Sequence, residues 1–252
     1  MGRPSRPVAS TEEPGFPVGL VADEGVGEEA RAHALDVVLA AARHSPRPVL
    51  HARLTLRLHR DPALERPAVA KASLDVAGRP VRAHVAATQM SEALDLLERR
   101  LRRNLEDLEE SRRARRRETG VAAAGEWRHG SLPPERPEHF PRPPEERELV
   151  RRKTFAPAAL SADEAALELR LLDHDFHLFT NAETGMEDVV HRRDDGTVAH
   201  DRGPAPALLL DDALERLNAG GERFVFFTDP QSRRGKLVYL RYDGHYGLIE
   251  PD

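Results

Sequence analysis

An internal repeat in the second half of the chain constrains the fold more than any other feature. Residues 157–200 and 205–248 align without a gap at an offset of 48 and share twelve identities over 44 positions. Chance agreement at ordinary residue frequencies would give roughly two or three. A repeat of this period indicates successive copies of one structural unit. Because a unit of about 48 residues is near the lower limit for folding alone, we expect each copy to bury apolar surface against the other.

Each copy is predicted to form a short helix followed by two or three strands. Residues 176–179 and 224–227 are short aromatic strands, which we expect to pair with strands at 189–193 and 237–242. The Asp-Gly pair that follows each second strand is typical of a tight turn. We predict that the core between the copies consists of Phe176, Phe179, Val190, Phe224, Phe227, Val238 and Tyr246.

The first half of the chain shows a different pattern, a βαβββα order of elements. A weak strand at 16–22 precedes a predicted helix over 28–44. Strict alternation over 50–59 predicts a strand with these residues on one face: Leu50, Ala52, Leu54, Leu56 and Leu58. Two further strands at 70–76 and 81–85 precede a long helix that begins near Ser91, with a leucine stripe at spacings of three and four. This predicts a two-layer sandwich of one sheet and two helices, and an α+β fold for the whole chain.

Proline-rich stretches divide the chain into domains. We expect a disordered tail, a βαβββα domain, a proline-rich linker that is extended in parts, and two small α+β repeats. The boundaries that we predict are 1–15, 16–117, 118–153, 154–203 and 204–252.

The net charge of −5 hides an asymmetry between the halves. Residues 20–117 hold 19 Lys and Arg against 15 Asp and Glu, whereas residues 154–252 hold 10 against 19. A basic front half and an acidic back half indicate that only the front half meets a polyanion. Ordinary scatter of surface charge is the alternative.

The positions of the cations favour phosphate contacts over a merely solvated surface. One predicted face of the front sheet carries Arg53, Arg57, Lys71, Arg82 and His84, and the long helix adds Arg99, Arg100, Arg102 and Arg103, then Arg112 and Arg113 near its end. The alternative is the solvated face of an antiparallel sheet. The basic strands carry no aromatic residues, which argues against stacking of single-stranded bases. Folded RNA, bound through its shape and backbone, fits better.

Several function classes lack their signatures. The chain has no cysteine, which excludes disulfides, thiolate zinc sites and cysteine nucleophiles. No nucleotide-binding glycine loop, nucleophile elbow or HExxH helix occurs. In a strand His174 and His177 would point to opposite faces, so they are not expected to bind a metal. We expect no enzyme, cofactor, metal or small-molecule substrate, no membrane span or secretion signal, and a cytoplasmic location.

Two segments of the back half carry a family resemblance. Residues 173–185 with 189–193, and residues 242–251 at the end of the chain, resemble the C-terminal domain of long-form ribosome hibernation promoting factors. The front half resembles the ribosome-binding domain of that family through its order of elements and the segment 97–103. The duplicated second half resembles the dormancy-associated type of actinobacteria.

The resemblance implies a function. The family's N-terminal domain sits on 16S rRNA in the decoding centre of the small ribosomal subunit, where it blocks mRNA and tRNA and protects idle ribosomes under stress. Matching positions imply RNA contacts by Lys71, Arg79, Arg82, Arg99, Arg100 and Arg103. The first helix departs from the family pattern, because it is rich in alanine and has few cations.

The C-terminal domain of ordinary long forms homodimerises and joins two ribosomes. We hypothesise that the two copies in this chain instead pair with each other, so that single ribosomes are silenced. Ribosomal proteins are candidate partners of the acidic half. The alternatives are a ribosome-dimerising factor, a regulatory adaptor whose second half recruits another protein, and an RNA-processing enzyme.

Overall fold

A computed structural model of the chain describes residues 15–61, 64–117, 142–155, 159–201 and 205–252, with the backbone alone at 114–117 and at 155. Nearly all of the predicted tail and residues 118–141 of the predicted linker lie outside these ranges. The described chain divides into two compact units. The first comprises the described residues up to 137 together with the short segment 170–174, and the second comprises the described residues of 138–169 and 175–252. Each unit is described by itself.

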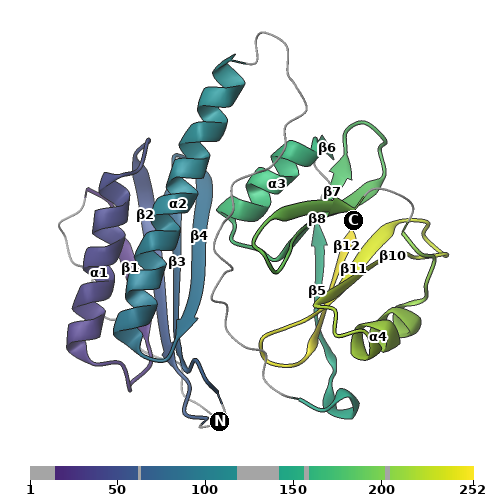
Figure 1. Cartoon of the computed structure of the whole chain (residues 1–252), viewed down its shortest axis with the longest axis horizontal. Helices are drawn as coiled ribbons and strands as arrows, with labels where there is room; N and C mark the ends of the chain where they lie inside the picture. Colours follow the sequence, from purple (N-terminus) through teal and green to yellow (C-terminus); the bar gives the residue numbers. More distant parts are fainter. Residues whose placement is uncertain (1–14, 62–63, 118–141, 156–158, 202–204) are drawn as a thin grey trace. The chain divides into compact units, whose positions relative to one another are not determined.

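The first unit is a four-stranded sheet with a layer of two helices (Figure 1). The strands lie in the order β1-β2-β3-β4; β1 runs parallel to β2, and the other pairs are antiparallel. Its elements are β1 (Val18–Ala22), α1 (Glu28–Arg43), β2 (Val49–Leu58), β3 (Ala68–Val76), β4 (Arg79–Ala87) and α2 (Met90–Arg117). The predicted βαβββα order is therefore confirmed.

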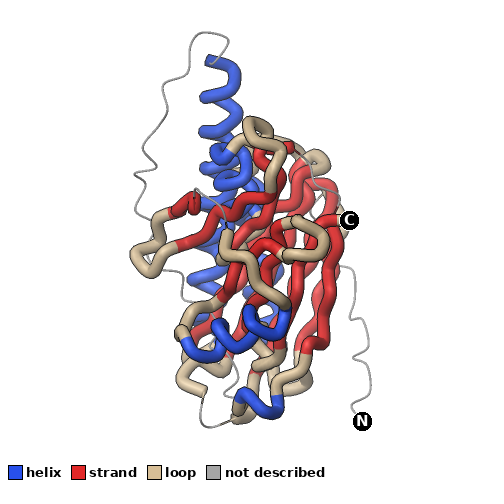
Figure 2. The backbone as a smooth tube through the Cα atoms, turned by 90° about the vertical axis from the view of Figure 1, so that its right-hand side faces the viewer, coloured by secondary structure: helices blue, strands red, loops and turns tan. Residues whose placement is uncertain are grey.

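Alternation along the strands forms the core of this unit. Leu54 and Leu56 of β2 and Leu74 of β3 are fully buried, because residues two apart along a strand point to the same face. The leucine stripe of α2, in which Leu97 and Leu101 are also fully buried, packs mainly against β4 and β3. The last turns of α2 extend beyond the end of the sheet (Figures 1 and 2).

Leu50 departs from the predicted alternation. Its side chain is 52% exposed, because the register of β2 against β3 shifts between Val49 and His51. Such a bulge turns one extra residue out of the regular pattern. Val49 is buried in its place.

The second unit contains two four-stranded sheets and two short helices. The first sheet has the order β6-β7-β8-β9 and the second β10-β11-β12-β5. The elements are η1 (Pro144–Glu146), β5 (Leu149–Phe155), β6 (Ala159–Leu160), α3 (Ala162–Leu171), β7 (Phe176–Asn181), β8 (Glu187–Arg192), β9 (Val198–Asp201), α4 (Leu210–Ala219), β10 (Phe224–Thr228), β11 (Gly235–Leu240) and β12 (Tyr246–Pro251).

The two copies of the repeat have matching backbone topologies. Phe176 pairs with His191 across β7 and β8, and Phe224 pairs with Tyr239 across β10 and β11. These residues differ by 48 positions, as do those of the parallel bridges Ala159–Thr180 and Ala207–Thr228. The offset found in the sequence is therefore the offset between equivalent places in the fold.

Strand β5 corrects the predicted boundary between linker and first repeat. Residues 149–155 lie ahead of the first repeat in sequence, yet they pair in parallel with β12, the last strand of the second repeat. The linker prediction ran to residue 153 because the segment is rich in charge and lacks apolar alternation. It is a strand because the outer edge of β12 offers backbone hydrogen-bond partners, which the side-chain pattern of β5 does not reveal.

Three apolar clusters organise the second unit. One lies between α3 and the first sheet, around Leu169 and Phe179, and one between α4 and the second sheet, around Leu217 and Phe227. The third joins the opposite faces of the two sheets. Each sheet therefore packs one face against the helix of its own repeat. Its opposite face packs against the sheet of the other repeat.

Within the described ranges, no helix is both long and apolar enough to cross a membrane.

Leu237 lies fully buried in the cluster between the repeats, whereas Leu209 is 51% exposed. We expect Leu237→Ala to lower the free energy of unfolding by about 2–5 kcal/mol through the cavity it leaves. Leu209→Ala, a matched control, should change it by about 0.5 kcal/mol or less. Chemical denaturation of the two variants measures the difference, and equal effects would contradict the assignment of the cluster.

Candidate nucleic-acid interface and repeat contact

The open face of the first sheet, opposite the helices, carries two adjacent rows of polar side chains. In one row Arg53, Ser73 and Arg82 are directly paired across β2, β3 and β4. In the next row Lys71 lies between Thr55 and His84. Side chains at paired positions have Cβ atoms about 4.5–5.5 Å apart. The structure therefore brings Arg53, Lys71, Arg82 and His84 together, as the alternation predicted; we call these residues and Arg57 the sheet cations.

Crowding of positive charge is visible at Lys71. Partial desolvation by the surrounding strands, and then repulsion from Arg57, lower the pKa of its ammonium. Neither row contains a carboxylate, and Asp75 lies one row further along, 3.7 Å from His51 Nδ1. A bound anion would relieve this repulsion, so the face is suited to a phosphate ligand.

The helix arginines form a separate surface. The leucine stripe of α2 faces the sheet, so Arg99, Arg102 and Arg103 are exposed on the helix layer. The Arg100 side chain is only 15% exposed, and its Nε lies 3.3 Å from Asp173 Oδ1. The four arginines are neighbours of one another at helical spacings of three and four. Because the helices cover one face of the sheet and the sheet cations occupy the other, the structure does not join the two predicted groups into one patch.

Several helix arginines already have acidic partners. Arg102 Nη2 lies 2.7 Å from Glu98 Oε1, and the side chains of Arg112 and Arg113 share Glu109 at 3.6 and 3.2 Å. Such exposed i,i+3 and i,i+4 pairs contribute little to stability, but they partly neutralise the cations.

Arg79 is exposed at the turn between β3 and β4. The turn places Ala77 at φ 51° and Gly78 at φ 84°, and the Gly78 amide donates to Asp75 Oδ1 at 2.6 Å. This left-handed backbone suits glycine best. Arg79 thus projects from a tight hairpin turn and belongs to neither cationic group.

The contact between the repeats uses fewer of the predicted residues than expected. Of the seven predicted residues, Phe176 and Phe224 lie in the shared cluster. The prediction was wrong for the other five, Phe179, Val190, Phe227, Val238 and Tyr246, which pack inside their own repeats. Alternation along each strand turns them toward α3 or α4 instead.

Most of the residues that the sequence analysis missed lie one position away from these, and Ile249 lies three positions from Tyr246. The cluster between the sheets is formed by Leu178, Val189 and Leu237, with Phe176, Phe224, Phe226, Tyr239 and Ile249 packed against it. Both faces of these strands are apolar, so the pattern alone did not show which face meets the helix and which meets the other repeat. The two-residue period of a strand separates Phe176 and Leu178 from Phe179, and Phe224 and Phe226 from Phe227, but it does not show which of the two faces meets the helix.

Aromatic contacts across this cluster follow an approximate two-fold symmetry. The rings of Phe176 and Phe224, which are equivalent in the two repeats, lie 5.2 Å apart. Phe176 lies 5.0 Å from Tyr239, and the equivalent contact, Phe224 to His191, measures 5.4 Å. The two repeats therefore meet through the same surface of each.

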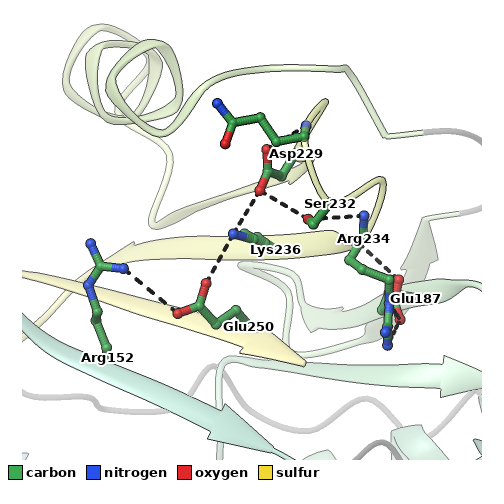
Figure 3. A network of polar contacts seen from close by, with 9 residues as sticks. Arg152, Glu187, Asp229, Ser232, Arg234, Lys236 and Glu250 are labelled. Carbon is green, nitrogen blue, oxygen red and sulfur yellow. Dashed lines mark hydrogen bonds and ion pairs between the residues drawn. The ribbon is translucent and has the colours of Figure 1, made fainter. Parts of the chain in front are cut away.

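A polar network borders the cluster (Figure 3). Glu250 of β12 binds Arg152 of β5 at 3.8 Å and Lys236 of β11 at 3.1 Å, and Lys236 binds Asp229 at 2.8 Å. Ser232 donates to Asp229 and accepts from the amide of Arg234, completing a connection along the β10–β11 hairpin.

At the other end of this network Arg234 crosses to the first repeat. Its Nε donates to Glu187 Oε1 at 2.8 Å, and the Gly235 amide donates to Glu187 Oε2 at 2.9 Å. Burial works against ionisation of Glu187, but these hydrogen bonds outweigh it and lower the pKa of its carboxyl group. The carboxylate is thus held in its charged form between the two repeats.

Asp229 shows the largest change in acidity. The hydrogen bond from Lys236, followed by that from the Gln231 amide, lowers its pKa from 3.8 to about 2. Desolvation opposes protonation of Lys236, yet its hydrogen bonds to Asp229 and Glu250 raise its pKa. Both shifts favour the ion pair.

No group of three or more potential ligand side chains with metal-binding geometry occurs in the described ranges. His174, Asp175 and His177 are thus not gathered into a metal site. The arrangement offers charged and apolar surfaces for binding.

The second unit matches a known domain family twice. The model of the sigma 54 modulation/S30EA ribosomal protein C terminus matches residues 144–199 and 197–248. Residues 144–248 are therefore similar to two consecutive copies of this domain, which we call the first and second S30EA domains. The first S30EA domain includes β5, which agrees with the corrected boundary.

Relatives with described roles include two from bacteria. A dormancy associated translation inhibitor of Mycobacterium tuberculosis is 31% identical over 157 residues, which cover 52% of this chain and 57% of the relative. A ribosome hibernation promotion factor of Bacillus subtilis is 45% identical over 49 residues, 19% of this chain and 26% of the relative. The chain thus matches little more than half the length of the mycobacterial relative. The resemblance seen in the sequence is confirmed.

Among solved structures, the N-terminal domain of Thermus thermophilus Protein Y matches with a TM-score of 0.30 at 18% identity, covering 35% of this chain and 93% of that domain.

Acid should destabilise the second unit through Asp229. A carboxyl group whose pKa is lower in the folded state contributes stability above its unfolded pKa, and this is lost as the pH falls through the folded value. We expect the Tm to fall between pH 4 and about pH 2, and Asp229→Asn to reduce this dependence while lowering the Tm at pH 7. Asp194→Asn, at an exposed position in the turn between β8 and β9 of the first repeat, is the control. Thermal denaturation against pH measures the effect, and an unchanged profile for Asp229→Asn would contradict it.

Proposed function

We propose that this protein is a ribosome hibernation factor that acts by binding and not by catalysis. Its first unit binds 16S rRNA at the decoding centre of the small subunit and occupies the space of mRNA and tRNA. Translation is thereby inhibited and the idle ribosome protected. The names of the mycobacterial and Bacillus relatives support the general role.

The observation that carries the RNA proposal is the pair of cationic rows on the open sheet face. The rows contain no carboxylate and no Phe, Tyr or Trp, and the imidazole of His84 is their one aromatic ring, so they offer mainly charge and little surface for stacking bases. Phosphate oxygens are the ligands that arginine and lysine bind best in nucleic acids. A rigid sheet presenting these cations fits a folded RNA backbone.

The acidic second unit has a different task in this proposal. Its charge of −9, from 10 basic and 19 acidic residues at 154–252, disfavours extensive contact with RNA. Its two S30EA domains pair within one chain, and this pairing occupies the apolar surface that could otherwise join two chains. A saturated ribosome therefore remains single, with the acidic unit at its periphery or against ribosomal protein.

Charge reversal tests which cationic surface meets RNA. We expect Arg53→Glu, Lys71→Glu and Arg82→Glu together to weaken co-sedimentation with small subunits by at least about a hundredfold, because attractive phosphate contacts become repulsive. Arg99→Glu, Arg100→Glu and Arg103→Glu together test the helix surface, where we also expect loss of binding. Arg193→Glu, Arg216→Glu and Arg223→Glu reverse as many charges in the second unit and should leave binding unchanged. Retention by both first-unit variants would contradict RNA binding through this unit.

Salt and sedimentation test the rest of the proposal. Since each neutralised phosphate releases counterions, the logarithm of the affinity should fall linearly with the logarithm of the salt concentration. Ribosomes saturated with the full chain should sediment as single particles. Binding that is indifferent to salt would contradict the electrostatic mechanism, and a protein-dependent dimer peak would contradict pairing within the chain.

A further inference from the structure

The two S30EA domains differ at the point where their equivalent strands approach most closely. Glu187 begins β8 and Gly235 begins β11, and the two residues are 48 positions apart, so they occupy the same place in the repeat. They nevertheless face each other, with the Gly235 amide donating to Glu187 Oε2 at 2.9 Å. A residue that faces its own equivalent lies on the approximate two-fold axis.

There is room for one side chain at this axis. A Cβ atom added to Gly235 would lie 2.6 Å from Glu187 Cβ and 2.9 Å from Phe226 Cε2. These distances are shorter than van der Waals contact between carbon atoms allows. One repeat must therefore contribute glycine if the other contributes a larger residue.

Charge imposes a second condition. The Glu187 side chain is 3% exposed and is bound by Arg234, with Arg234 Nη2 2.7 Å from Glu187 Oε1 (Figure 3). The residue equivalent to Arg234 in the first repeat is Met186, which is 54% exposed. The first repeat thus supplies an acid without its cation, and the second a cation without its acid.

These conditions exclude pairing of like repeats in the same geometry. Two first repeats would place two Glu187 side chains in space for one, as buried carboxylates without an arginine. Two second repeats would leave Arg234 of each without a carboxylate. The Arg234 side chain is 40% exposed, so the larger penalty falls on a buried Glu187 carboxylate that lacks its arginine, whereas the complete pair can specify which surfaces meet.

We propose that Glu187, Gly235 and Arg234 form a specificity lock that makes this surface accept the unlike repeat only. A second copy of the chain cannot dock its first repeat on the first repeat of another, nor its second on the second. This inference rests on the proposed pairing within the chain. It explains how divergence at two neighbouring positions of the repeat, Met186/Arg234 and Glu187/Gly235, disfavours pairing of like repeats from two chains.

Exchanging the lock between the repeats tests it in the full chain. Gly235→Glu places two carboxylates at the axis, and amide hydrogen exchange in β8 and β11 should accelerate at least about tenfold. Adding Glu187→Gly removes the crowding and should restore part of the protection. Adding Met186→Arg and Arg234→Met as well rebuilds the ion pair in reverse and should bring exchange close to that of the unaltered chain.

Ala219→Glu, at an exposed position of α4, adds the same charge to the second repeat and should leave exchange in β8 and β11 unchanged. If Gly235→Glu has no effect, or if the reversed lock protects no better than Gly235→Glu alone, the proposal is overturned. Native mass spectrometry of the same samples should show monomers for the reversed lock, and dimers would also overturn it. These measurements are made without ribosomes, so a negative result would overturn the specificity lock but not the proposal of ribosome binding. If the lock is confirmed but ribosomes saturated with the protein sediment as dimers, the proposed function is overturned instead.

Discussion

The second unit depends on one contact, the packing of two apolar sheet faces against each other. Each repeat of 48 residues has its own small core beneath a helix, yet Phe176, Leu178, Phe224 and Leu237 lie on the opposite faces of their sheets. Left open, those faces would be two apolar patches beside an acidic surface, the kind of surface that draws proteins into association. Placing both in one chain makes their meeting intramolecular, so the effective concentration of one for the other no longer depends on the amount of protein.

Strand β5 strengthens this argument from the backbone. The segment precedes the first repeat but completes the sheet of the second by pairing with β12. The tandem region is therefore interleaved, with its first strand and its last strand side by side. Separating the repeats would break this ladder and the apolar cluster together, and hence the two contacts should be lost cooperatively.

Much of this architecture can be predicted from the sequence, and the exceptions have physical reasons. The 48-residue offset predicted the equivalent hairpins, and the alternation around Arg53 and Lys71 placed both residues on the open face. The bulge at Leu50, the strand at 149–155 and the face on which Phe179 packs could not be derived in the same way. Each depends on a backbone partner distant in the sequence or on a strand apolar on both faces, whereas side-chain periodicity reports only that a face is apolar.

The charged residues of the two units have different surroundings. In the first unit cations stand beside other cations, whereas in the second unit the acidic groups at the contact between the repeats are paired with cations. On the open sheet face of the first unit, like charges stand next to each other, and desolvation by burial, followed by repulsion from Arg57, lowers the pKa of the Lys71 ammonium. In the second unit Glu187 and Asp229 are matched by Arg234 and Lys236, so the acidic groups at the repeat contact are already satisfied internally. Under the proposed function, an anionic polymer would bind the first unit in preference to the second. The paired repeats also cover their apolar faces, and the excess of acidic over basic residues at 154–252 agrees with the proposal that this unit does not bind RNA.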